Sequence, residues 1–480
     1  MNRSLASAGA RGGMLSLAGQ GVTVLVKLTT IVVLARLITP DEFGVAAIAT
    51  TIASYVVSLM PLGLTLAVVQ APVVSRAAVS SLFVLNLVIG TLAAGALFGL
   101  SFVLPTVYGL PELQPLLGWL ALGPLLAALS CQSQAQLLRH FRFSRLIGAE
   151  VISQLTALAV TIAIAAAGYG IAALAVQVLL QTGLLSLLVI VFARWRPGRP
   201  APLRGEVSDL LREGMRIFGM NAVSAGSHAA VVPALGVVTE PGPLGQYDRA
   251  QQIIFLPVML AVEQLQRIAV PVLSKLRAMP DRFEVFLVRA QLLLAYPSAL
   301  VFLCVAALGP QVVEVALGPG WDLAGHLVQV LAIGGVFRTA SQSTRWGLIA
   351  AGRSREGLVM TTAVQVGVLL ITLSALPAGV MGVAIANSIA WGLAWPVSVI
   401  VSARTIGVSP WKQIGVTTRG VLVSGVAAVC AFCTTFLQLG DVATLGVGAA
   451  AALAALAAMT IIPVVRHDYA ALVDTLRRAR

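Results

Sequence analysis

Apolar residues fall into about fourteen stretches of roughly 20 residues, separated by short polar gaps. At about 1.5 Å of rise per residue, a helix of this length crosses the roughly 30 Å hydrocarbon core of a bilayer. The pattern therefore predicts an all-α integral membrane protein with about 14 transmembrane helices. The predicted spans are 14-36, 44-68, 79-104, 114-136, 147-168, 171-193, 214-237, 245-268, 286-309, 324-350, 357-376, 380-403, 416-437 and 443-465.

The composition supports a membrane environment. The chain is 58% hydrophobic and 10% charged, with a mean hydropathy of +0.95, which leaves too few polar residues to cover a soluble fold of 480 residues. A formal net charge of +13 would suggest nucleic acid as the partner of a soluble protein. Here the positive residues lie in short loops between spans, where they set topology and meet anionic lipid, so we expect no nucleic-acid partner.

Lys and Arg alternate between the gaps. The loops around 105-113, 167-171, 308-325, 376-382 and 438-444 contain none, whereas the gaps between them are basic. Basic loops stay on the cytoplasmic side of a membrane, so the pattern predicts that both termini are cytoplasmic. The first span is interpreted as an uncleaved helix, because no small-residue cleavage site precedes the second.

The chain also contains an internal repeat. An ungapped shift of about 201 residues aligns an ordered set of similar positions. The aligned pairs are Gly13-Met14 with Gly214-Met215, Gln20 with Asn221, Thr23 with Ser224, Lys27 with His228, Pro40 with Pro241, and Phe43-Gly44 with Leu244-Gly245. A shift of six helices preserves orientation, so the halves are expected to be related by a pseudo-two-fold axis along the membrane normal.

This repeat predicts the domain organisation. Helices 1-6 form an N-terminal lobe, and helices 7-12 form a C-terminal lobe; a basic cytoplasmic linker joins them, and two extra helices and a tail follow. The predicted bounds are 1-194, 195-213 for the linker, 214-404, 405-465 for helices 13-14, and 466-480 for the cytoplasmic tail.

Polar residues form a stripe on the first helix and on its repeat. Gln20, Thr23 and Lys27 share one helical face, and the seventh helix repeats the stripe as Asn221, Ser224 and His228. A lysine near mid-span costs about 2.5 to 3.5 kcal/mol on insertion scales. Either it faces a hydrated cavity, which the matching stripes favour, or it pairs with a carbonyl or Gln in a packed interface.

Other polar and kinked positions occur inside the spans. Asp248, Arg249 and Gln252 lie at the outer end of the eighth helix. Arg338 lies deep in the tenth predicted span, where a guanidinium suits a phosphate or carboxylate, and a structural bond to a neighbouring helix fits equally well. A proline within a span either permits a hinge or forms a static kink. The candidate hinges or kinks are Pro61 and Pro257.

The residues that would indicate an enzyme are few. The acidic pair Asp41 and Glu42 would suit a membrane glycosyltransferase or polymerase, but Thr39 before it more readily begins a helix whose first turn favours acids. There is no phosphate-binding glycine loop, metal-ligand spacing or nucleophile triad, so the sequence predicts no catalytic residue, metal or cofactor.

Four stretches resemble a known family. They run from Leu34 to Gly44, from Leu244 to Ala250, from Pro271 to Leu276, and from Leu317 to Trp321. Together they resemble signatures of bacterial polysaccharide exporters, the Wzx-type flippases of the multidrug/oligosaccharidyl-lipid/polysaccharide superfamily.

The resemblance implies two six-helix lobes around a central cavity in the bacterial inner membrane. It implies transport of an undecaprenyl-pyrophosphate-linked oligosaccharide to the outer leaflet by alternating access, with membrane lipids and a polysaccharide polymerase or export machinery as candidate partners. Lys27 would then face the cavity, with Arg36, Arg249 and Arg338 as further cationic positions. A cation-coupled multidrug exporter of the same superfamily, a glycosyltransferase and a non-transporting scaffold are the alternatives.

Overall fold

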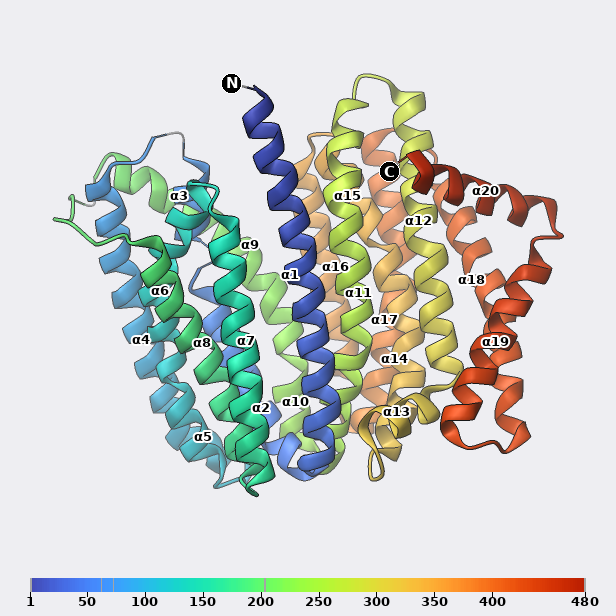
Figure 1. The fold of residues 1–480 in the computed structure, drawn as a ribbon, viewed down its shortest axis with the longest axis horizontal. Helices are drawn as coiled ribbons and strands as arrows, with labels where there is room; N and C mark the ends of the chain where they lie inside the picture. The colour runs from blue at the N-terminus through green and yellow to red at the C-terminus, as the bar shows by residue number, and fades with distance from the viewer. Residues whose placement is uncertain (1, 62, 72, 203, 479–480) are drawn as a thin grey trace. The chain divides into compact units, whose positions relative to one another are not determined.

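The computed structural model describes residues 2–61, 63–71, 73–202 and 204–478. All regular secondary structure in these ranges is helical, as predicted (Figure 1). The chain divides into two compact units, one running to Gly245 and the other starting at Gln246.

The first unit contains ten helices and the first turn of an eleventh. Their bounds are α1 Asn2–Leu37, α2 Pro40–Leu59, α3 Leu64–Gln70, α4 Arg76–Tyr108, α5 Leu113–Leu120, α6 Leu122–Arg139, α7 Phe143–Ala166, α8 Gly170–Ala193, α9 Glu206–Ala229 and α10 Val231–Val238.

The second unit starts within α11 and runs through the remaining helices. Their bounds are α11 Pro241–Lys275, α12 Pro280–Ala307, α13 Gly309–Leu317, α14 Asp322–Ala340, α15 Gln342–Ala350, α16 Ser354–Ser374, the short 3₁₀ helix η1 Leu376–Ala378, α17 Gly379–Ile406, α18 Pro410–Cys433, η2 Thr434–Leu437, α19 Asp441–Met459 and α20 Pro463–Arg478.

Every predicted span coincides with one helix or with consecutive helices. Eleven helical segments in the described residues are long and apolar enough to cross a membrane. The remaining three predicted spans correspond to α1, to α9 with α10, and to α11, the elements that carry the polar stripes and the Asp248 region.

Four predicted spans are interrupted well inside their bounds, and others, including 286-309 and 443-465, are interrupted near their ends. α2 ends at Leu59 and α3 begins at Leu64, so Pro61 lies in a turn between two helices. The other three internal breaks fall at Ala121, Ala230 and Ser341. Pro233 follows the break at Ala230 within one turn, where its missing N–H removes a helical hydrogen bond.

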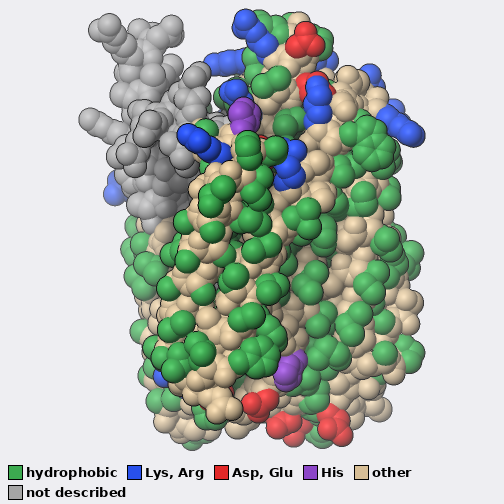
Figure 2. All heavy atoms as spheres, turned by 90° about the vertical axis from the view of Figure 1, so that its right-hand side faces the viewer, with side chains coloured by type: hydrophobic (Ala, Val, Ile, Leu, Met, Phe, Trp, Pro, Cys, Tyr) green, Lys and Arg blue, Asp and Glu red, His purple; other side chains and the backbone are tan. Residues whose placement is uncertain are grey.

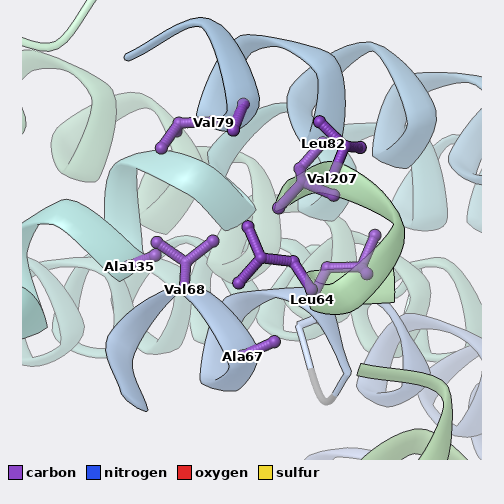
Figure 3. Packing of buried hydrophobic residues seen from close by; sticks show 9 residues of the cluster. Leu64, Ala67, Val68, Val79, Leu82, Ala135 and Val207 are labelled. Carbon is purple, nitrogen blue, oxygen red and sulfur yellow. The ribbon is translucent and has the colours of Figure 1, made fainter. Parts of the chain in front are cut away.

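The short helix α3 anchors one end of the first unit. Leu64, Ala67 and Val68 of α3 are buried against Leu82 of α4 and Val207 of α9 (Figure 3). Val79 and Ala135 complete the labelled cluster. Burial of aliphatic side chains at this junction, worth about 1.5–3 kcal/mol each, fixes α3 between the longer helices.

The first turns of α2 and α11 meet through a pair of glycines. A Cβ on Gly44 would overlap the carbonyl oxygen of Pro241, and a Cβ on Gly245 would overlap the carbonyl oxygen of Pro40. These four positions are two pairs aligned by the sequence repeat. A reciprocal contact of this kind is what two copies make at a two-fold axis.

Charge separates along the face shown in Figure 2. Lys and Arg side chains gather at one end of this face, Asp and Glu lie mainly at the other, and hydrophobic side chains cover the region between. An apolar band with charged ends is the surface that a bilayer requires.

The amphipathic helix α20 is tied to two longer helices of its unit. Asp468 accepts hydrogen bonds from the Tyr296 hydroxyl at 2.6 Å and from the Arg419 guanidinium at 3.0 Å. Tyr469 packs edge-on against Tyr296, with the two ring centroids 5.9 Å apart. Aromatic pairs favour centroid separations of about 4.5–7 Å. The start of α20 is thereby fixed to α12 and α18.

Candidate functional site

Lys27 lies on the face of α1 that is buried further along the helix. It shares a helical face with Ile31, Leu34 and Ile38, which follow it at intervals of four, seven and eleven residues and are all buried. Leu25, whose side chain is 64% exposed, lies about 160° away around the axis, since each residue turns a helix by about 100°. Lys27 itself is exposed, so the face that is packed at one end of the helix is open at Lys27.

The rest of the predicted stripe is described only in part. Thr23 is half-buried one turn before Lys27, and His228 is exposed in the last turn of α9. The side chains of Gln20, Asn221, Ser224 and Pro257 lie outside the described residues, although the helix α11 is continuous through position 257.

Asp248, Arg249 and Gln252 come together in a buried cluster. The Asp248 carboxylate accepts hydrogen bonds from Arg249 Nη2 at 2.6 Å and from Gln252 Nε2 at 3.0 Å. The side chains of the ion pair are 10% and 11% exposed. One turn away, Gln251 Nε2 donates to the Tyr247 hydroxyl at 2.7 Å. The positive charge of Arg249 is therefore balanced by an adjacent carboxylate, which sequence periodicity did not reveal.

Replacing Asp248 by Ala is expected to destabilise the protein strongly, because Arg249 would lose its buried counter-charge. The free energy of unfolding is expected to fall by about 3–5 kcal/mol. The matched control is Asp209→Ala, which removes an ion pair with Arg212 whose side chains are 77% and 69% exposed and which is worth about 0–1 kcal/mol. Thermal unfolding of the purified protein in detergent compares the two; equal stability losses would contradict a dominant role for burial.

The Arg338 guanidinium lies between two aromatic rings. Its central carbon is 5.1 Å from the centroid of Phe255 and 5.5 Å from the centroid of Trp391. Cation–π contacts of this kind are worth about 0.5–2 kcal/mol each and hold the planar group in one orientation. The structure thus supplies a specific contact of Arg338 to neighbouring helices, one of the two roles that the sequence left open.

The acidic pair at the start of α2 has a structural role at Glu42. Thr39 Oγ1 accepts from the Glu42 backbone N–H at 3.4 Å, and the Glu42 carboxylate accepts from the Thr39 backbone N–H at 3.0 Å. This reciprocal capping box satisfies two N–H groups of the first turn. Asp41 is exposed beside it, and Arg36 is exposed in the last turn of α1. The predicted cap at Thr39 is confirmed.

Glu150 is a charged residue that the sequence interpretation overlooked. It is the sole acidic residue of α7, a helix that is otherwise apolar over most of its length. The signal was present, because an ionisable residue inside a membrane span is by default a functional candidate. In the described part of the chain, no group of three or more His, Cys, Asp and Glu is arranged to hold a metal ion.

Solved structures with this fold are membrane transporters. The inward closed conformation of the lipid II flippase MurJ matches with a TM-score of 0.76 over 94% of this chain and 99% of that chain, at 13% identity. An inward-facing multidrug resistance MATE family transporter of the multidrug/oligosaccharidyl-lipid/polysaccharide superfamily matches with a TM-score of 0.65 over 80% of this chain and 94% of that chain, at 15% identity. The chain therefore has the all-helical fold of these membrane proteins, as predicted.

Sequence comparison specifies the family. The family model described as polysaccharide biosynthesis protein matches residues 33–325, more than half of the chain, so this protein belongs to that family. The amylovoran biosynthesis protein AmsL of Erwinia amylovora is 23% identical over 288 residues, covering 59% of this chain and 74% of AmsL. The predicted polysaccharide exporter resemblance is confirmed.

Proposed function

We propose that this protein is a flippase that moves an undecaprenyl-pyrophosphate-linked oligosaccharide from the inner to the outer leaflet of the bacterial cytoplasmic membrane. Membership of a polysaccharide biosynthesis family and the fold of a lipid II flippase support this class of substrate. The observation that carries the proposal is the exposed Lys27 on the face of α1 that is buried at Ile31 and Leu34, opposite the exposed Leu25. An accessible cation within a membrane helix suits a pyrophosphate.

The remaining predicted residues have assigned roles in this proposal. Arg36 and Arg338 contribute positive potential for the pyrophosphate, and the polar stripes on α1 and α9 contact sugar hydroxyls. Arg249, which was predicted for the same role, is paired with Asp248 and would reach the ligand only if that ion pair opens. Alternating access of the two lobes, 1-194 and 214-404, exposes the site to each side in turn, with Pro61 and Pro257 as the positions that bend. Both termini are cytoplasmic in this scheme, and no catalytic step is involved.

The test is a flipping assay with the purified full-length protein in vesicles. The probe is an undecaprenyl-pyrophosphate-linked oligosaccharide with a fluorescent sugar, which a membrane-impermeant reagent bleaches from outside. In vesicles with the protein, the reagent should bleach nearly all of the probe. In protein-free vesicles, it should bleach only the probe in the outer leaflet. Equal bleaching in both would overturn the proposal. Sugar transfer by the purified protein, lost on replacing Asp41 and Glu42 together, would instead establish the enzyme.

A further inference from the structure

Glu150 places an isolated carboxylate beside the Lys27 face. It lies about 10 Å into α7 at 1.5 Å per residue and is half-buried. Its carboxylate forms no hydrogen bond or ion pair with any side chain that the structure describes. One turn further along α7, Gln154 Oε1 is buried, also without a described partner. A charged carboxylate is costly in such surroundings unless a cation neutralises it.

The packing of α1 against α7 places Lys27 and Glu150 on the same side of the helix pair. The two helices pack together, with Gly19 facing Ile147, and as the first and fifth predicted spans they run in the same direction. From Gly19, Lys27 is rotated by about 80° around α1; from Ile147, Glu150 is rotated by about 60° in the opposite sense around α7. On helices that run in the same direction, opposite rotations lead to the same side.

The lipid-exposed residues of these helices lie on the other side. Leu25 of α1 and Leu155 of α7 are 64% and 47% exposed, and the same geometry rotates both away from Lys27 and Glu150. Along the axis, Lys27 is about 7.5 Å beyond Glu150, and helical side chains lean toward the N-terminus, so its ammonium leans back toward the carboxylate.

Other charges near Glu150 are committed elsewhere or distant. α8 carries no titratable residue. On α6, Arg139 donates to the carbonyl oxygens of Val68 and Ala71, and His140 ends the helix. On α7 itself, Arg145 donates to the Phe192 carbonyl and Arg142 precedes the first turn. On α1, Arg36 is nine residues beyond Lys27 on another face, and the side chains of Arg3 and Arg11 are outside the described residues.

We propose that Glu150 is a proton-binding site that controls the affinity of Lys27 for the anionic headgroup. This inference rests on the proposed function. When Glu150 is ionised, its negative charge attracts the Lys27 ammonium and repels a pyrophosphate. When the carboxylate takes up a proton, the repulsion disappears and the Lys27 charge is available to the ligand. Proton binding and pyrophosphate binding therefore favour each other, by the same factor in both directions.

The test measures binding of undecaprenyl pyrophosphate to the full-length protein in detergent, from mildly acidic to mildly basic pH. Glu150→Gln mimics the protonated state, so it should bind about tenfold more tightly than the wild type at basic pH and no more tightly at acidic pH. Protonation of the ligand itself affects binding to the wild type and to Glu150→Gln equally. The difference between their two pH profiles therefore reports on Glu150 alone. Glu150→Asp should restore the pH dependence, and Glu112→Gln, on an exposed turn, should retain it.

A measurement on the unmodified protein covers the case in which Glu150→Gln does not fold. Infrared difference spectra on adding undecaprenyl pyrophosphate should show the band of a newly protonated carboxyl group; its absence overturns the proposal. Identical pH dependence in wild type and Glu150→Gln also overturns it, while vesicle flipping by the wild type would leave the proposed function intact. If the wild type neither binds undecaprenyl pyrophosphate nor flips the probe, both the proposed function and the proposed role of Glu150 are wrong.

Discussion

Lys27→Ala is expected to reduce flipping of the lipid-linked oligosaccharide by about tenfold to a hundredfold while the protein still inserts and folds. A hydrogen bond to a charged group is worth about 1.5–3 kcal/mol, and each 1.4 kcal/mol is a factor of ten. The loss of flipping rate should exceed that caused by shortening another side chain of α1, because no other cation on α1 shares the face of Ile31 and Leu34. The vesicle assay measures the rate.

Two controls separate the charge of Lys27 from its packing. Lys27→Arg keeps the positive charge and should retain much of the activity, and Leu25→Ala shortens a side chain on the opposite, exposed face and should leave flipping unchanged. A wild-type flipping rate in Lys27→Ala would remove Lys27 from the mechanism. Equal losses in Lys27→Ala and Leu25→Ala would point to general damage to α1.

Gly44→Ala and Gly245→Ala are each expected to destabilise the protein by about 1–3 kcal/mol or more, because the new methyl group meets a backbone carbonyl that cannot rotate away. Reciprocity predicts losses of similar size from the two positions. Thermal unfolding in detergent is the measurement, with protein yield as a second indicator.

The matched controls are Gly95→Ala and Gly99→Ala in α4. A Cβ at either position has nothing within 4 Å, so these variants should be neutral or slightly stabilising, since alanine favours a helix by about 1 kcal/mol over glycine. If Gly44→Ala were as stable as Gly99→Ala, the close approach of α2 and α11 would not exist in solution.

Hydropathy and repeat pattern together predicted most of the fold. The long apolar runs identified the membrane-crossing segments, because twenty apolar residues have few other stable arrangements. The repeat aligned Pro40 with Pro241 and Gly44 with Gly245. In the structure, each of these glycines contacts the proline of the other repeat. The cap at Thr39 was predicted because capping is local, decided by residues three apart.

The parts that were missed depend on tertiary packing. The break at Ser341 has no proline within a turn of it, so periodicity continued across it. The break at Ala121 precedes Pro124 by three residues, the spacing that separates Ala230 from Pro233. The partner of Arg249 proved to be its own neighbour Asp248, although adjacent residues on a helix ordinarily diverge by about 100°. Glu150 was visible in the sequence, but its relation to Lys27 required the contact between α1 and α7. The positions of the lobe boundaries and the orientation of the termini stay predictions.

The meeting of α2 and α11 has a mechanical consequence. Where Gly44 and Gly245 bring two main chains together with no side chain between them, one helix cannot slide along the other without first lifting away from it. A change of crossing angle requires no such separation. The contact between these two helix starts therefore resists shear and permits tilt.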